Sequence, residues 1–174
     1  MPLPILLRPF QPGDAPALRA LFHAAVHEIA RRDYAPEQLQ AWAPLEHDAQ
    51  AWAERLRANH PWVAEVARTG AGPAQAGAGA ASVPAGFADL QDDGYIDQFF
   101  VAPAFAGQGV ARALMAHLHA QAAQRGIARL WAHVSLTAEP FFAAQGFVVQ
   151  ERRTVERAGV VLRNALMAKA LAPG

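Results

Sequence analysis

The sequence contains no cysteine in its 174 residues. This absence excludes disulfide bonds, thiolate metal sites and a cysteine nucleophile together. Any covalent catalysis by this protein would therefore require a side chain other than a thiol. A chain of this length buries about 70% of its extended surface on folding, so a core can form without a disulfide or a metal.

A net charge and long apolar runs are absent as well. Fifteen basic and fifteen acidic residues cancel, whereas proteins that neutralise many phosphates carry a basic excess, so we expect no extended nucleic-acid binding. No run approaches the roughly 20 apolar residues that span a bilayer. The apolar start Ile5-Leu6-Leu7 is interrupted at once by Arg8 and Pro9, unlike a signal peptide. These features predict a cytoplasmic protein without a membrane partner.

Hydrophobic residues are abundant, at 53% of the chain against 17% charged residues, which is typical of a packed globule. The length fits a single domain, residues 1–174. Residues 69–84 are rich in Ala, Gly and Pro and contain no charged residue. Because strand-like segments flank them, at 62–67 and 87–90, we interpret this stretch as an enlarged, flexible hairpin loop within that domain.

Hydrophobic periodicity predicts the helices and strands. Apolar residues from Leu18 to Ile29 recur at helical spacing, and Asp14 is a candidate cap for this helix. Further helices are expected at 36–42, 48–58, 110–125 and 138–145. Strands are expected at 5–9, 62–67, 87–90, 95–101, 129–134, 147–154 and 160–169. This order predicts a mixed α/β protein built around one sheet.

The segment from Phe99 to Arg112 has the form of an anion-binding loop. An apolar strand ends at Pro103, a loop with Gly107 and Gly109 follows, and a long helix begins directly after it. The N-terminus of a helix presents unpaired N–H groups and about half a positive charge, which suits a pyrophosphate. The two glycines let the backbone approach phosphate groups without a Cβ in the way.

Three anion-binding motifs compete for this segment, and two of them do not fit. A P-loop ends in Gly-Lys-Ser/Thr, whereas residues 109–111 supply neither a lysine nor a hydroxyl. A dinucleotide fingerprint requires a third glycine where Arg112 stands, early in a repeating βαβ chain. The third motif, Gln/Arg-x-x-Gly-x-Gly/Ala, is the acetyl-CoA loop of the GNAT superfamily. Residues 106–111, Ala-Gly-Gln-Gly-Val-Ala, match its two small-residue positions.

The sequence resembles the GNAT superfamily over nearly its whole length. Residues 135–147 are similar to the family's Asn-x-x-Ala-x-x-x-Tyr-x-x-x-Gly-Phe, with Ser135 for the asparagine and Phe142 for the tyrosine. Ala106 stands where the family usually has Gln or Arg, which removes one side-chain contact to the pyrophosphate. Residues 32–44 also resemble one uncharacterised branch of the superfamily, in a region that typically lines the acceptor pocket.

The resemblance implies a GNAT fold, with one central, mixed and largely antiparallel sheet of about 6–7 strands flanked by helices. It also implies acetyl-CoA as cosubstrate, no metal, and direct transfer of the acetyl group to a primary amine of a small molecule or peptide. A backbone N–H of Phe99 or its neighbour would polarise the thioester carbonyl. The residues expected to bind acetyl-CoA are Phe99, Phe100, Val101, Ala106, Gly107, Gln108, Gly109, Val110, Ala111, Arg112, Ser135 and Phe142.

Three residues are candidates for the proton transfers. An alkyl ammonium with a pKa near 10.4 is mostly charged at pH 7, so the acceptor amine needs a base. Asp97 is the first candidate, because a carboxylate on this strand often has that role in the family. Its alternative is an ion-paired strand residue. Tyr34 can serve as base, acid or substrate contact, or simply as a packing residue. Tyr95 or an ordered water can replace the missing tyrosine at Phe142 as proton donor.

Two other functions stay open. Phe142 and Ala106 are compatible with a non-catalytic acyl-CoA-binding module of the same fold. An acetyltransferase acting on aminoacyl-tRNA is disfavoured by the neutral charge. His23 and His27 have a spacing compatible with metal binding, but no third ligand is evident, so we expect no metal. Because many GNAT proteins pair, a homodimer is an expectation of the resemblance.

Overall fold

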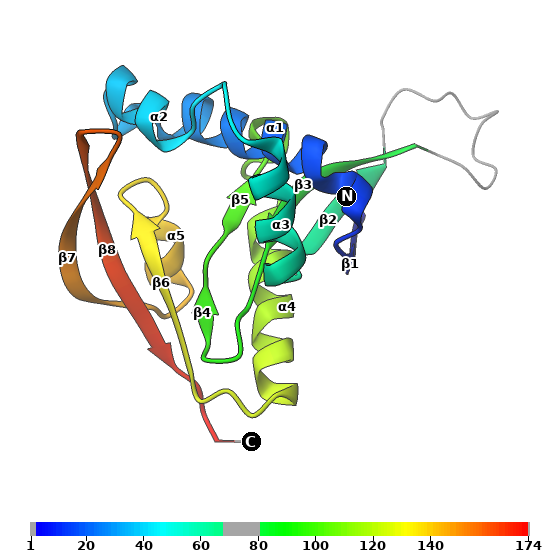
Figure 1. Cartoon of the computed structure of the whole chain (residues 1–174). Coiled ribbons are helices and arrows are strands. Elements are labelled where there is room, and N and C mark those ends of the chain that lie inside the picture. Colours follow the sequence, from blue (N-terminus) through cyan, green and yellow to red (C-terminus); the bar gives the residue numbers. More distant parts are fainter. Residues whose placement is uncertain (1–2, 68–80, 174) are drawn as a thin grey trace.

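The protein's computed structural model describes residues 3–67 and 81–173, in which eight strands form two four-stranded sheets (Figure 1). The first sheet is antiparallel and has the order β1 (Ile5–Pro9), β2 (Trp62–Ala67), β3 (Ser82–Ala88) and β5 (Phe99–Val101). The second has the order β4 (Tyr95–Ile96), β6 (Arg129–Ser135), β8 (Val160–Ala170) and β7 (Val148–Arg157). In it β4 and β6 are parallel, and the other pairs are antiparallel.

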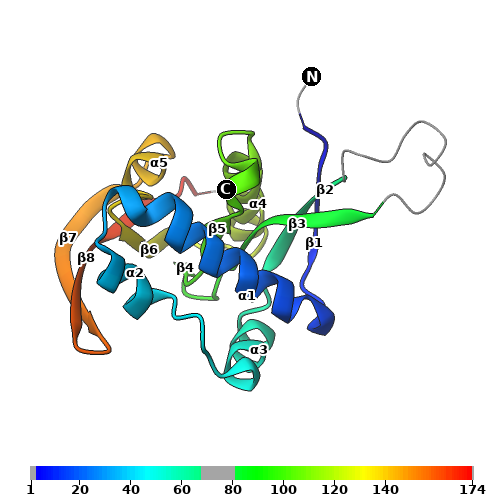
Figure 2. The ribbon, with the colours of Figure 1, turned by 90° about the horizontal axis from the view of Figure 1, so that it is seen from above.

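Helices cover both sheets and confirm the mixed α/β class. Three of them, α1 (Ala15–Ala24), α2 (Pro36–Trp42) and α3 (Ala49–Asn59), lie together over one end of the sheets (Figure 2). The long α4 (Val110–Gln124) packs on the first sheet, and the short α5 (Glu139–Ala144) follows β6. Short helical turns lie at Pro12–Asp14, Ala30–Arg32 and Pro103–Phe105, and α1 continues into a π-helical turn at Ala25–Ile29. None of the helices in the described residues is both long and apolar enough to cross a bilayer.

The predicted strand at 95–101 is broken in two, and this break turns the expected single sheet into two. Asp89 is fully buried, and its carboxylate accepts the backbone N–H of Asp97 at 2.8 Å. The strand ladder is therefore interrupted at Asp97 and Gln98. Before the break β4 pairs with β6, and after it β5 pairs with β3. As a result β5 and β6 diverge, as Figure 1 shows.

Two local predictions differ from the structure. Asp14 does not cap α1 with its side chain; instead its carboxylate accepts hydrogen bonds from Arg8 at 2.7 Å and from the Gln11 N–H at 2.7 Å. An available guanidinium competes successfully with the helix N–H groups for this carboxylate. The loop predicted at 69–84 is shorter at its C-terminal end, because β3 begins at Ser82. Residues 69–80 lie outside the described residues.

The core fixes the position of the α4 N-terminus beside β5. The buried face of α4 lies on the first sheet, where Gly86 allows a close approach. A Cβ at Gly86 would lie 2.9 Å from the carbonyl oxygen of Phe100 and 3.0 Å from the Leu114 side chain. A larger residue here would push α4 away from β5. The α4 residues that fill this interface are Val110, Leu114, Met115, Leu118 and Ala122.

Candidate active site

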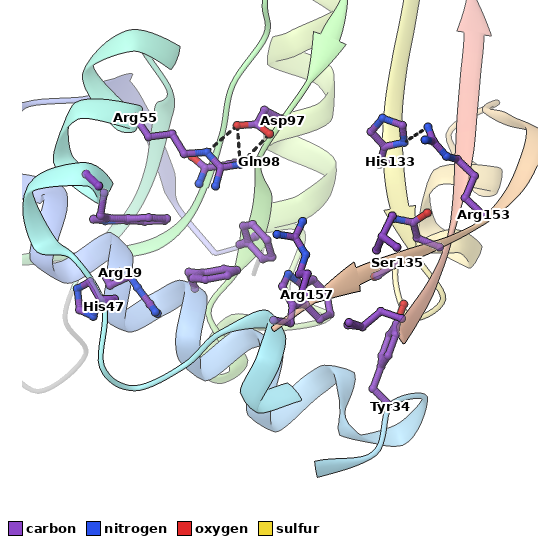
Figure 3. Close-up of a pocket in the computed structure, with 18 of the residues that line it drawn as sticks. Arg19, Tyr34, His47, Arg55, Asp97, Gln98, His133, Ser135, Arg153 and Arg157 are labelled. Carbon is purple, nitrogen blue, oxygen red and sulfur yellow. Dashed lines mark hydrogen bonds and ion pairs between the residues drawn. The ribbon is translucent and has the colours of Figure 1, made fainter. Parts of the chain in front are cut away.

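Two cavities adjoin at the break between the sheets. The first, of about 460 Å³, lies between α1–α3 and the β6–β8–β7 sheet, and Figure 3 shows its lining. The second, of about 540 Å³, lies between the α4 N-terminus, the π-helical turn and α5. Trp42, Phe100 and Ser135 line both cavities. The two spaces therefore meet beside β5, a geometry that can bring two separately bound molecules into contact.

The second cavity contains the predicted anion-binding loop. Gly107 and Gly109 adopt left-handed conformations, with φ of 74° and 91°, and an added Cβ on either would meet no atom within 4 Å. A side chain here would thus enter open space that a ligand can use. Gly109 is the N-cap of the 15-residue α4, whose first N–H groups lack intrahelical partners. Unpaired donors, open space and the helix dipole together fit a pyrophosphate.

Most of the residues predicted to bind acetyl-CoA line this cavity. They are Phe99, Phe100, Val101, Ala106, Gly107, Gly109, Ala111, Arg112, Ser135 and Phe142. Gln108 and Val110 are the exceptions. The Gln108 side chain donates back to the carbonyl of Ala104, and Val110 is fully buried in the core. The backbone N–H of Gln108 donates to the carbonyl of Phe105 at 3.3 Å, so of these two residues only Val110 can offer a ligand its backbone N–H group.

The edge of β5 faces the gap between the sheets. Gln98 accepts a backbone hydrogen bond from Asp89, and Ala102 donates one to Ala85, so alternate residues from 98 to 102 face β3. The backbone groups of Phe99 and Val101 then point to the opposite side. No strand pairs with that side of β5 in the described residues. This edge can bind an extended ligand in the manner of an added strand.

Asp97 lies in the first cavity, at the break between β4 and β5. Its carboxylate accepts two hydrogen bonds from Arg55, at 2.8 and 3.0 Å, and one from Asn59 at 2.7 Å. Its side chain is 18% exposed and borders the cavity. The structure thus brings together both sequence interpretations, since Asp97 is ion-paired and also accessible from the cavity. This position suits proton transfer through an intervening water.

Tyr95 also lies in the first cavity, beside Asp97. Its ring stacks on Trp131 at 4.3 Å between centroids, and its hydroxyl lies 3.4 Å from the Asp97 carboxylate. Burial raises the pKa of Tyr95 to about 12, and the negative charge of Asp97 adds to the effect. The hydroxyl therefore keeps its proton at neutral pH and is a hydrogen-bond donor.

Tyr34 is more deeply enclosed than the other two candidates. It is 6% exposed, and its hydroxyl donates to the carbonyl of Arg163 at 2.5 Å and accepts from the N–H of Leu136 at 2.9 Å. Burial raises the pKa of this hydroxyl. With its proton already donated to a backbone carbonyl, Tyr34 connects β8 to the loop after β6. The geometry favours a role in shaping the cavity over one in proton transfer.

Comparisons with known proteins agree with this geometry. A family model described as an acetyltransferase (GNAT) domain matches residues 30–169. The chain is 33% identical over 163 residues to YafP, an uncharacterized N-acetyltransferase of Escherichia coli strain K12, and the match covers 94% of each chain. The chain belongs to the GNAT acetyltransferase family. Because the family and this relative are N-acetyltransferases, the protein is an acyltransferase.

Solved GNAT structures share the fold along the whole chain. A GCN5-related N-acetyltransferase from Rhodopseudomonas palustris has a TM-score of 0.84 at 34% identity, covering 98% of this chain and 99% of the other. YncA, a putative acetyltransferase from Salmonella typhimurium with its cofactor acetyl-CoA, has a TM-score of 0.65 at 17% identity, covering 98% and 96%. At this level of identity, the similarity to YncA shows a common fold alone.

The structure shows how this GNAT protein accommodates its two departures from the family motifs. Phe142 is 3% exposed and packs edge-on against Phe99 and Phe147, so an apolar ring fills the place of the usual tyrosine. Ala106 leaves its part of the second cavity without a polar side chain. Arg112 and Arg32 line the same cavity and supply positive charge there.

Two features of the site could not be found in the sequence pattern. The π-helical turn at Ala25–Ile29 lines the second cavity, yet its apolar residues continue the spacing of α1. Such turns are frequent at functional sites. The other is Asp89, whose carboxylate holds the N–H of Asp97 and also accepts from Asn59 at 3.1 Å. Its only sequence signal is an acidic residue at the end of an apolar strand.

Asp89 is expected to make the stability of the protein decrease as the pH rises. Burial raises its pKa to about 6, although the hydrogen bond from Asp97 opposes the shift. Between about pH 4 and pH 6 the native state therefore retains a proton that the unfolded chain has released. The resulting contribution to the free energy of unfolding is complete below about pH 4. It is lost as the pH rises through 6, at a cost of about 3 kcal/mol.

Urea unfolding between pH 4 and pH 8 tests this expectation. The wild-type free energy of unfolding should fall across the window, whereas the Asp89→Asn variant should lack this component of the slope. The two proteins are compared by the slope of the free energy of unfolding against pH. Its absolute value is not compared, because asparagine also alters the hydrogen bond with Asn59. Parallel pH profiles for the two proteins would show that Asp89 is not the titrating group.

The two histidines with a spacing compatible with metal binding lie on α1 (His23) and in the π-helical turn that follows it (His27). The rings of His23 and His27 stack at 4.1 Å between centroids, and the Nε2 of His27 lies 2.8 Å from the carbonyl of Ala43. In the part of the chain that the structure describes, no group of three or more His, Asp or Glu side chains is placed to hold a metal ion.

Proposed function

We propose that this GNAT protein transfers the acetyl group of acetyl-CoA directly to a primary amine of a small molecule or peptide. The observation that carries the proposal is the meeting of the two cavities beside the free edge of β5. One cavity ends at an unpaired helix N-terminus, and the other contains a carboxylate and a protonated tyrosine. The presence of acetyl-CoA in the YncA structure supports the choice of cosubstrate.

Acetyl-CoA would bind in the second cavity. Its pyrophosphate would accept hydrogen bonds from the backbone N–H groups at the start of α4, from Gly109 to Arg112, with the Arg112 side chain adding charge. The pantetheine arm would run along β5 and pair with the free groups of Phe99 and Val101. The thioester then lies where the cavities meet, near Ser135.

The first cavity would hold the acceptor amine. Asp97, directly or through a water, takes the proton that the ammonium must lose. The nitrogen forms a bond to the acetyl carbon while the carbon–sulfur bond breaks, and the second proton that this nitrogen loses neutralises the departing CoA thiolate. The Phe99 N–H stabilises the developing oxyanion by about 3–4 kcal/mol. A thiol with a pKa near 8.5 can depart without help, and the Tyr95 hydroxyl is a further proton donor. Tyr34 fixes the wall of the cavity.

The experiment is a screen of amines with purified protein and acetyl-CoA. Released CoA is measured with a thiol reagent, and the acetylated amine is identified by mass spectrometry. Release that depends on an amine, together with its acetylated product, supports the proposal. Binding of acetyl-CoA without turnover of any amine would instead favour the acyl-CoA-binding module, for which the apolar Phe142 is the specific observation.

A further inference from the structure

The first cavity is strongly cationic. Four arginine side chains reach it, from α1 (Arg19), α3 (Arg55) and β7 (Arg153 and Arg157), as Figure 3 shows. The carboxylates that line it belong to Asp48 and Asp97. His47 and His133 are also present, and burial together with the charge of Arg153 lowers the pKa of His133, so it adds no full charge at neutral pH.

The two carboxylates are already engaged. Asp97 is paired with Arg55. Asp48 is the N-cap of α3 and accepts the N–H groups of Gln50 and Ala51, at 2.9 and 3.0 Å. In the described residues, neither Arg19, Arg153 nor Arg157 forms an ion pair with a carboxylate. Their charges therefore remain unneutralised within the cavity.

Among these residues, Arg19 gives the strongest evidence for an anionic ligand, because its charged side chain is buried. It is 6% exposed, and its guanidinium lies 5.0 Å from the ring of Phe22 and 5.7 Å from that of Trp52. One nitrogen donates to the carbonyl of Pro44. A guanidinium has five N–H donors, and burying its charge without an anion is costly. A ligand with negative charge would remove this cost.

Arg153 and Arg157 lie on the same face of β7, across the cavity from Arg19. The strand register places Arg153 opposite Asn164 and Arg157 opposite Val160. Arg163 is opposite Thr154, so its side chain projects from the other face of the sheet, although its backbone borders the cavity. The pattern on β7 thus directs two guanidinium groups toward one space.

We propose that the acceptor carries an oxyanion, a carboxylate or phosphate, in addition to its amine, and that Arg19, Arg153 and Arg157 recognise it. The inference rests on the proposed function. Guanidinium groups match oxyanions in geometry as well as in charge. The same positive charge disfavours an ammonium and so lowers the pKa of the bound amine toward its reactive form. Polyamines, which carry several positive charges, are poor acceptors in such a cavity.

The test compares amines in matched pairs that differ in the anionic group. An α-amino acid is paired with its amide, and O-phosphoethanolamine with ethanolamine, which separates carboxylate from phosphate recognition. The wild-type protein is expected to have a kcat/KM at least about tenfold higher for the anionic member of a pair, the size of a single charged hydrogen bond. Equal or lower values for both anionic members would overturn the inference and leave the proposed function intact.

Substitutions of single arginines test which residues recognise the anionic group. Arg153→Gln and Arg157→Gln should each raise the KM of the anionic amine about tenfold, whereas the KM of the matched neutral amine should change much less. Arg163→Gln, whose side chain lies on the other face, is the matched control and should leave the preference unchanged. A preference that survives both β7 variants would contradict the assignment.

A binding measurement keeps the inference testable without turnover. Inorganic phosphate and N-acetylglycine are titrated into the CoA-loaded protein by calorimetry. Saturable binding of either probe that is lost in Arg157→Gln but kept in Arg163→Gln supports the anion site. No binding of either probe would contradict the anion site, and failure of every amine to react would contradict only the proposed function.

Discussion

Replacing Gly109 by glutamate is expected to weaken acetyl-CoA binding at least about 100-fold, or about 2.7 kcal/mol. Gly109 caps α4 with φ of 91°, and a Cβ there would enter the open second cavity. The new carboxylate would lie beside the N–H groups proposed to bind the pyrophosphate, and its negative charge would repel the pyrophosphate. The left-handed backbone adds strain of about 1–2 kcal/mol. Calorimetric titration with acetyl-CoA measures the effect.

Gly126→Glu is the matched control for this variant. Gly126 lies just beyond the other end of α4, has φ of 66°, and an added Cβ would also meet no atom within 4 Å. The control therefore adds the same charge and a similar strain about 20 Å or more away along the helix. It should bind acetyl-CoA like the wild type. Equal losses in both variants would show that strain, rather than the loop's contact with the ligand, explains the effect.

Replacing Asp97 by asparagine is expected to lower kcat by about 100-fold or more, the usual contribution of a positioned base. Asparagine keeps the shape of the side chain and can still accept from Arg55, but it cannot take a proton. The KM for acetyl-CoA should change little, because Asp97 lines the first cavity and not the second. Steady-state kinetics at a fixed pH measures both quantities.

Arg55→Gln separates the base from the ion pair. This variant removes the partner of Asp97 and keeps the carboxylate, so its kcat should remain within about tenfold of the wild type. A similar collapse of kcat in both variants would assign the effect of Asp97→Asn to the lost ion pair. A small effect in both would exclude Asp97 as the proton acceptor.

The sequence was sufficient for the parts of the site that depend on local chain geometry. Glycines at 107 and 109 directly before an amphipathic helix predict a loop that leads into a helix N-terminus, and the structure places both glycines at the start of α4. The break at Asp97 could not be predicted, because it depends on the buried carboxylate of Asp89. Tyr95 and Phe99, on either side of the break, are apolar enough that the sequence pattern predicts one continuous strand.

The cationic cavity could not be predicted for a related reason. Arg19, Arg55 and Arg157 come from three elements far apart in the sequence, and only the tertiary structure brings them together. The neutral total charge conceals this local excess. Likewise, Asp14 looked like a helix cap in isolation, because the sequence does not show that β1 places Arg8 beside it.

The most direct test of direct acetyl transfer follows an isotopically labelled acetyl group. The protein is incubated with labelled acetyl-CoA and the best amine from the screen, and mass spectrometry locates the label while released CoA is measured in parallel. Direct transfer predicts labelled amine in an amount equal to the released CoA, with no labelled protein. Label on the protein, or release of CoA without labelled amine, would contradict the account.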